Sequence, residues 1–170
     1  MSLSIFSAAR QAPHAEALVC DGQRLSFSAL AARVQARRGQ LERLGVRPLA
    51  SAPVALVVDG SLSMFEWLYL CLELGVPVLP LHPRLTAPER ESLVRASGAA
   101  CTIDPSQTEP GAETAEAREV FAVPEHQPLA WVPSSGSTGR PKLVELSRRA
   151  FRALCAADAQ RVPPRSADRA

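Results

Sequence analysis

Apolar and polar stretches alternate along the first part of the chain and divide it into short strands and helices. Residues 17–20 and 24–27 flank an Asp-Gly pair, which predicts two strands joined by a tight turn. From Ser26 or Ser28, apolar residues recur with helical spacing as far as Leu44, and arginines occupy the opposite side. We therefore expect a serine-capped, half-exposed amphipathic helix to follow the hairpin.

A second group of elements lies between residues 53 and 103. Residues 53–58 form an apolar, β-branched run that is typical of a strand buried on both faces. Ser63, with Glu66 three residues later, predicts a capping box at the start of a largely apolar, buried helix. Strands are expected at 76–81 and 99–103. Between them, Thr86 and Glu89 predict a second capping box.

The rest of the chain continues the same alternation. A polar surface segment is expected at 104–118 and a short strand at 119–123, followed by strands at 129–133 and 143–146. A helix then begins near Ser147. The whole pattern predicts an α/β fold with a mainly parallel sheet flanked by helices. We divide the chain into an α/β subdomain (1–128), a strand–loop–strand unit (129–146), and a helix with a polar tail (147–170) that we expect to be cut rather than finished.

Composition and charge exclude several classes of function. The formal net charge is +2 and aromatic residues make up only 5%, so there is no concentrated basic and aromatic surface for nucleic acid. Arg148, Arg149 and Arg152 are expected to form one solvated helical turn. Of the 19 basic residues, 18 are arginine, which leaves Lys142 as the single lysine.

Neither cysteine spacing nor hydropathy points to a metal site or a membrane. The four cysteines form no CxxC pair and no cluster with metal-ligand spacing, so no metal ligands are predicted. Cys71 and Cys101 are interpreted as core residues. The longest apolar run, around 67–74, is too short to span a membrane, and it is flanked or interrupted by Glu66 and Glu73. With no signal-peptide pattern at the start, a cytoplasmic location is expected.

Isolated histidines and aromatic residues receive structural interpretations. His14, His82 and His126 are far apart in sequence, and His82 beside a proline is expected to shape a turn. Asp59 is expected to form a cap or a turn. Trp67 is expected to lie in the core.

The most informative segment is the loop between the strands at 129–133 and 143–146. Gly136 and Gly139 permit backbone conformations in which N–H groups surround an anion. Lys142 adds a positive charge. Hydroxyl donors for phosphate oxygens come from Ser134, Ser135, Ser137 and Thr138. The loop lacks the Gly-Lys-Ser/Thr run of an NTPase P-loop and the GxGxxG pattern of a dinucleotide site. Composition alone leaves open an ordinary flexible surface hairpin.

The string SSGSTGRPK closely resembles the phosphate-loop signature of the adenylate-forming superfamily, which includes acyl- and aryl-CoA synthetases. Two upstream segments, LSFSAL at 25–30 and LELGVPVLPL at 72–81, resemble further family patterns in the expected order. Leu143 and Arg148 depart from the usual glycine and histidine. The resemblance implies the N-terminal subdomain of an adenylate-forming enzyme, and the shortness of the segment before the loop favours o-succinylbenzoate–CoA ligase-like enzymes.

The resemblance also implies a reaction. Family enzymes join a carboxylic acid to ATP, accompanied by Mg²⁺, and then transfer the acyl group from the adenylate to CoA. Ser134 through Gly139 would enclose the β- and γ-phosphates, and Lys142 would be the catalytic residue that stabilises the departing charge. The family's adenine and acyl pockets, ribose-binding aspartate and second catalytic lysine have no counterpart before Ala170.

Two hypotheses about this polypeptide therefore stay open. It is either part of an acid–CoA ligase, inactive alone and prone to self-association through exposed apolar surface, or a short non-catalytic interaction module that retains the phosphate loop.

Overall fold

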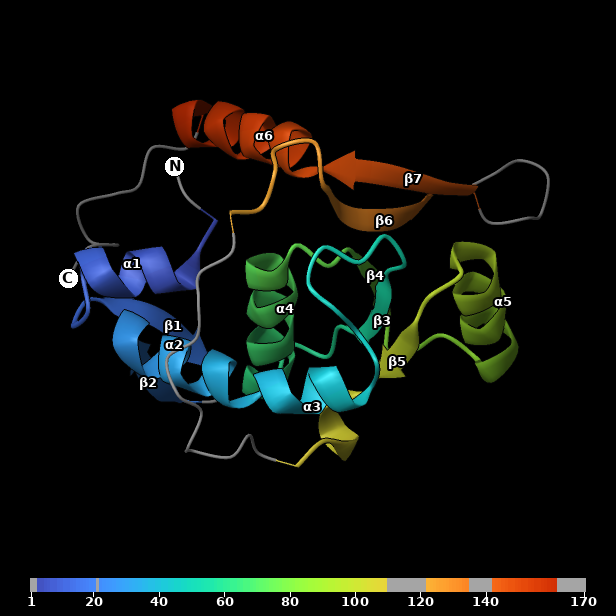
Figure 1. Cartoon of the computed structure of the whole chain (residues 1–170), viewed down its shortest axis with the longest axis horizontal. Helices are drawn as coiled ribbons and strands as arrows, with labels where there is room; N and C mark the ends of the chain where they lie inside the picture. Colours follow the sequence, from blue (N-terminus) through green and yellow to red (C-terminus); the bar gives the residue numbers. More distant parts are fainter. Residues whose placement is uncertain (1–2, 21, 110–121, 135–141, 162–170) are drawn as a thin grey trace.

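The computed structural model describes residues 3–20, 22–109, 122–134 and 142–161, with side chains up to residue 158 (Figure 1). The elements, in chain order, are α1 (Ile5–Gln11), β1 (Glu16–Cys20), β2 (Gln23–Ser26), α2 (Phe27–Ala36), α3 (Arg38–Arg43), β3 (Val54–Val57), α4 (Leu62–Leu74), β4 (Val78–Leu81), α5 (Ala87–Ser97), β5 (Cys101–Ile103), the 3₁₀ turn η1 (Pro105–Gln107), β6 (Pro128–Ser134), β7 (Lys142–Ser147) and α6 (Arg148–Arg161).

The main sheet has five strands in the order β5-β3-β4-β6-β7. Strands β5, β3, β4 and β6 run parallel, and β7 returns antiparallel to β6. β1 and β2 form a separate antiparallel hairpin. The predicted α/β fold with a mainly parallel sheet is therefore confirmed.

Helices cover both faces of this sheet, and each face has its own apolar core. The larger core joins the sheet to α4, α2 and α1, and it includes Trp67, which is 1% exposed. The smaller core lies on the other face, where Leu79 and Leu81 of β4 pack with Leu93 of α5. α4 and α5 accordingly lie on opposite sides of the sheet (Figure 1).

Most local signals correctly predicted where elements begin and end. The Ser26 side chain accepts a hydrogen bond from the Ala29 N–H and so caps α2, and Thr86 and Glu89 form the predicted capping box of α5. His82 shapes a turn, because its Nδ1 accepts a hydrogen bond from the Arg84 N–H at 3.1 Å. Asp59 likewise accepts from the Ser61 N–H.

Three expectations about individual elements were wrong in whole or in part. The helix expected to run without interruption to Leu44 is divided into α2 and α3 at Arg37. α4 is capped by Ser61 rather than Ser63, so Glu66 is not part of a capping box and is instead buried. Residues 122 and 123 are not in a strand, and the remainder of that predicted strand lies outside the described residues, as does the polar segment beyond Glu109. In addition, α1 was not predicted from the sequence.

Candidate phosphate-binding site

The predicted phosphate loop connects β6 to β7. Ser134 at the end of β6 and Lys142 at the start of β7 are paired in the antiparallel register, and both are exposed. The Ser134 hydroxyl donates to the Lys142 carbonyl oxygen at 3.1 Å, which closes the hairpin just before the loop. The other predicted site residues, Ser135, Gly136, Ser137, Thr138 and Gly139, lie outside the described residues.

The direction of the strands determines where this loop begins. Because β3, β4, β5 and β6 are parallel, their carboxyl ends meet at one edge of the sheet. Ser134 lies at that edge, together with Asp59 after β3 and His82 after β4. Ligands of open α/β sheets bind outside the carboxyl ends of the strands. The loop therefore starts on the side of the sheet where a binding site is expected.

The hairpin is held in place on one face by apolar packing. Trp131 of β6 and Leu143 of β7 pack against the smaller core, beside Leu79 and Leu81. Two polar side chains fix its other end to the carboxyl end of α4. Gln127 donates to the Gly75 carbonyl oxygen at 2.9 Å, and Arg148 donates to the Leu72 carbonyl oxygen at 2.8 Å.

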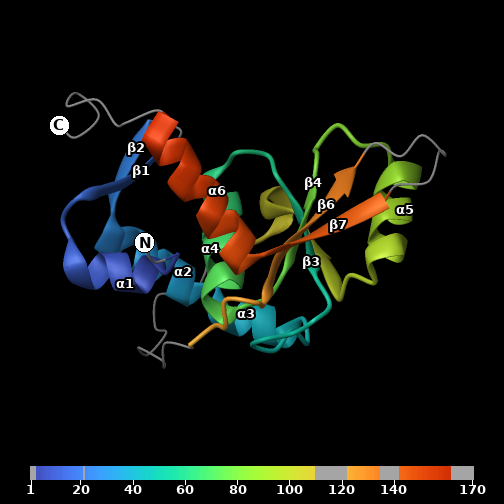
Figure 2. The same cartoon turned by 90° about the horizontal axis from the view of Figure 1, so that it is seen from above.

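Arg148 is the point at which α6 leaves the sheet and passes over α4 (Figure 2). The expectation of one solvated turn of arginines was wrong here, because Arg148 is only 9% exposed. Burial lowers the pKa of its guanidinium, and the charges of Glu125 and Glu73 act in the opposite direction. Arg152 forms an ion pair with Glu125 at the surface.

Glu73 completes this anchoring region from within α4. Its carboxylate accepts from the Ser4 hydroxyl at 3.0 Å and from the Phe6 N–H at 3.3 Å, so it holds the start of α1. Burial raises the pKa of Glu73, and the hydrogen bonds and the charge of Arg148 act to lower it. The base of the hairpin, α4 and α1 are thus linked by polar contacts.

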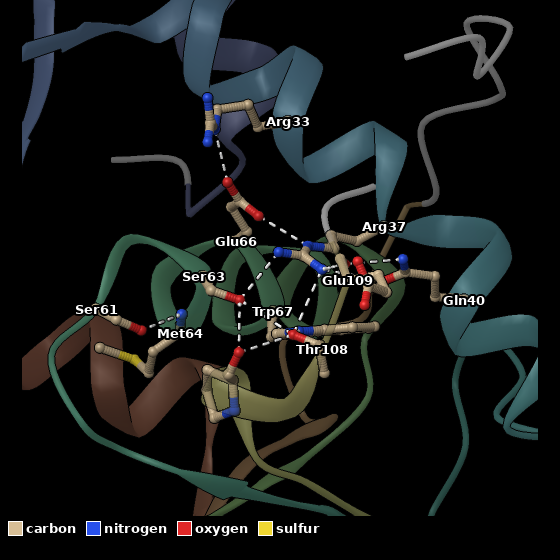
Figure 3. A network of polar contacts seen from close by, with 11 residues as sticks. Arg33, Arg37, Gln40, Ser61, Ser63, Met64, Glu66, Trp67, Thr108 and Glu109 are labelled. Atoms are coloured by element: carbon tan, nitrogen blue, oxygen red, sulfur yellow. Dashed lines mark hydrogen bonds and ion pairs between the residues drawn. The ribbon is translucent and has the colours of Figure 1, made fainter. Parts of the chain in front are cut away.

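A second polar network was missed by sequence reasoning (Figure 3). Glu66 accepts from Arg33 and from Arg37, each at 2.7 Å, and the Arg37 guanidinium lies 5.3 Å from the centre of the Trp67 ring. Arg37 also donates to the Ser63 hydroxyl at 2.9 Å and to the Glu109 carbonyl oxygen. This network joins α2 and α4 to the segment after η1. It lies on different elements from the β6–β7 hairpin, and its arrangement is that of a structural anchor.

The buried thiol of Cys71 belongs to the core, as predicted. Burial, with a smaller effect from Cys101, raises its pKa to about 12, so it stays protonated and unreactive at neutral pH. Among the described residues, no group of three His, Cys, Asp or Glu side chains is placed to hold a metal ion. No helix in the described part of the chain is long and apolar enough to cross a membrane.

The structure is an α/β domain in which the β6–β7 hairpin begins the predicted phosphate loop at the carboxyl edge of the sheet. The AMP-binding enzyme family matches residues 5–169. Among curated proteins, the chain is 32% identical to a feruloyl-CoA synthase of Amycolatopsis sp over 151 residues, which cover 79% of this chain and 30% of that protein. It is 27% identical to a fatty acid–[acyl-carrier-protein] ligase, ScoC, of Streptomyces coeruleorubidus, covering 86% of this chain and 32% of that protein.

Solved structures show the same fold at lower identity. O-succinylbenzoate coenzyme A synthetase (MenE) from Bacillus subtilis, in complex with AMP, has a TM-score of 0.76 and 21% identity, covering 95% of this chain and 46% of that one. The Klebsiella oxytoca NpsA N-terminal subdomain has a TM-score of 0.69 and 16% identity, covering 85% of this chain and 41% of that one. The chain belongs to the AMP-binding enzyme family. It has the fold of the N-terminal subdomain of adenylate-forming enzymes, and it spans about a third of the length of the curated relatives it matches.

Proposed function

We propose that the chain binds the polyphosphate of ATP at the β6–β7 connection, as part of an acid–CoA ligase. In that reaction a carboxylate attacks ATP to give an acyl-adenylate and pyrophosphate, and CoA then displaces AMP to give the thioester. The observation that carries the proposal is the position of the string SSGSTGRPK. It starts at Ser134, at the carboxyl edge of the sheet, and ends at Lys142, which is exposed at the first position of β7.

The proposed roles follow from the chemistry of these side chains. The segment from Ser134 to Gly139 would surround the β- and γ-phosphates with backbone N–H and hydroxyl donors. Ser134 would first exchange its present bond to the Lys142 carbonyl for one to phosphate. The Lys142 ammonium would offset the charge that develops on the pyrophosphate leaving group, which is electrostatic catalysis.

Mg²⁺ is proposed to accompany the nucleotide, because it neutralises and bridges phosphate oxygens. The acid substrate is proposed to be a small-molecule carboxylic acid. Of the two kinds of curated relative, one is a feruloyl-CoA synthase and the other a fatty acid ligase, so both aromatic and aliphatic acids are candidates. The o-succinylbenzoate synthetase supports the fold of the chain but not its substrate.

We propose the complete reaction only for a protein that contains all the elements of these relatives. The matched regions cover 30% and 32% of the two curated relatives. We therefore propose that the 170-residue chain binds nucleotide weakly and catalyses no adenylation alone. The matching measurement is acid-dependent exchange of pyrophosphate into ATP, which should stay at background with ferulic and fatty acids.

The direct test of the site is a calorimetric titration of the chain with MgATP. Lys142→Ala should weaken binding by about tenfold, because it removes a charge-assisted contact to phosphate. Arg10→Ala is the matched control, since it removes one exposed positive charge from α1, and it should leave the affinity unchanged. Equal affinity of the Lys142→Ala variant and the wild type, or no binding by either, would overturn the proposal.

A further inference from the structure

A row of polar side chains crosses three neighbouring strands at the carboxyl edge of the sheet. Ser134 of β6 is paired with Lys142 of β7. β4 pairs with β6 in a parallel register that sets Val78 opposite Ala130. The same offset, continued along both strands, brings His82 level with Ser134. The backbone bond from the Val58 N–H to the Leu81 carbonyl oxygen, at 2.9 Å, shows that β4 is still paired with the chain after β3 at this level.

The three side chains also share one face of the sheet. Leu79, Leu81, Trp131 and Leu143 all pack into the smaller core, on the α5 side. Side chains alternate between faces along a strand. The residues at the intervening positions, including His82, Ser134 and Lys142, therefore lie on the opposite face.

This face is open at the carboxyl edge. Val78, further back along β4, is only 3% exposed, whereas His82, Ser134 and Lys142 are all exposed. Between these two levels, Val132 and Val144 are paired in register and are 41% and 54% exposed. A ligand at the start of the phosphate loop therefore has access to the row.

The His82 ring has a defined orientation and a defined donor. Its Nδ1 accepts a hydrogen bond from the Arg84 N–H, which assigns the proton of the neutral ring to Nε2. That Nε2–H donates to no described residue. The turn thus holds the His82 imidazole at the level of Ser134, with its Nε2–H available to donate a hydrogen bond.

We infer that His82 is a further phosphate-binding residue, which donates its Nε2 proton to an oxygen of the polyphosphate held by Lys142. The inference rests on the proposed function and extends the site from the β6–β7 hairpin to β4. Phosphate oxygens are strong acceptors, and hydrogen bonds to charged acceptors are among the stronger ones. His82 would fix one side of the polyphosphate from a rigid strand end.

The first test is a titration of the isotope-labelled chain with magnesium pyrophosphate, followed by NMR of the histidine rings and of the backbone amides. The His82 ring resonances should move with the same dissociation constant as the amides of Ser134 and Lys142. The rings of His14 and His126 serve as internal controls and should not move.

The second test separates phosphate binding from the structural role of the turn. His82→Asn keeps a side-chain acceptor for the Arg84 N–H, as in an Asx turn, and removes the distal donor. It should weaken pyrophosphate binding by about tenfold while leaving the urea unfolding midpoint unchanged. His126→Asn, at another exposed position, should change neither.

The outcomes distinguish this inference from the proposed function. Movement of Ser134 and Lys142 without His82, or unchanged affinity in the His82→Asn variant, would overturn the role of His82 and leave the phosphate loop intact. No movement of any of these resonances would overturn both.

Discussion

Glu66 is a charged residue that the fold buries at the centre of α4. Its side chain is 4% exposed and faces Arg37, also 4% exposed, and Arg33, which is 49% exposed. A buried charge is tolerated only when it is paired and its remaining hydrogen-bonding groups are satisfied. Arg37 meets this condition through Glu66, Ser63 and the Glu109 carbonyl oxygen.

Glu66→Gln should therefore destabilise the fold strongly. The substitution keeps the size of the side chain but leaves the buried Arg37 charge without its counter-ion, at a cost of about 3 kcal/mol. Urea unfolding followed by circular dichroism would measure the loss. Glu16→Gln is the control, because its pair with Arg24 is exposed and should contribute less than about 1 kcal/mol. Equal losses in the two variants would contradict the account.

Residue-scale prediction from sequence worked where the signal was local. The cap at Ser26, the capping box of Thr86 and Glu89, and the turn at His82 each involve groups two or three positions apart. The role of Glu66 was not predicted, because its partners are 29 and 33 residues away in the sequence. The three-residue spacing from Ser63 to Glu66 suggested a capping box. In the structure, the Glu66 carboxylate instead accepts hydrogen bonds from Arg33 and Arg37.

At the scale of elements, the β6–β7 hairpin depends on α4 for its position. Gln127 and Arg148 bind the last carbonyl groups of α4 and its following Gly75, while Glu73 joins the same helix to α1. The loop thus extends from a hairpin that is fixed at its base. No pattern in the sequence indicated these links, because each side chain acts on a backbone group or element far away along the chain.

Glu73 makes the pH dependence of this region predictable. Burial raises its folded pKa above the ordinary value of 4.5. The folded state therefore binds the Glu73 proton more tightly than the unfolded state does. The resulting stabilisation is fully present below pH 4.5. It is lost as the pH rises through the raised folded pKa. Glu73→Gln should remove this loss. The free energy of unfolding of the variant, relative to that of the wild type, should therefore increase between pH 4.5 and pH 7.

Urea unfolding at several pH values would measure that shift, with Glu89→Gln as the control. Hydrogen bonds from Thr86 lower the pKa of the exposed Glu89, so its contribution is present above the ordinary value and is lost as the pH falls through the lowered folded pKa. The difference between Glu89→Gln and wild type should stay flat from pH 4.5 to 7. A flat difference for Glu73→Gln as well would contradict the assignment.

At the scale of the whole molecule, the open sheet face predicts self-association. Val132 and Val144 form an exposed apolar pair on β6 and β7, and Leu154 of α6 is 56% exposed. Light scattering should show a mass that rises above that of the monomer with concentration. A Val132→Thr and Val144→Thr double variant should reduce the rise, whereas Val19→Thr on β1, where the native side chain is 51% exposed, should not. A monodisperse wild-type monomer would contradict this prediction.

The overall architecture was predictable because alternating strands and helices leave few arrangements for an α/β chain. The site was predictable only in part. The string from Ser134 to Lys142 predicted a phosphate loop, which stays a prediction, and the structure adds that Ser134 and Lys142 lie at the carboxyl edge of the sheet. The alignment of His82 with that edge could not be deduced from sequence, because it depends on the register between β4 and β6, strands that are almost 50 residues apart.

The β6–β7 connection is proposed to recognise polyphosphate. The most direct measurement compares the affinities of the wild-type chain for MgATP and for AMP at the same ionic strength. MgATP should bind at least about tenfold more tightly, because AMP lacks the β- and γ-phosphates that Lys142 would contact. Equal affinities, or tighter binding of AMP, would contradict it.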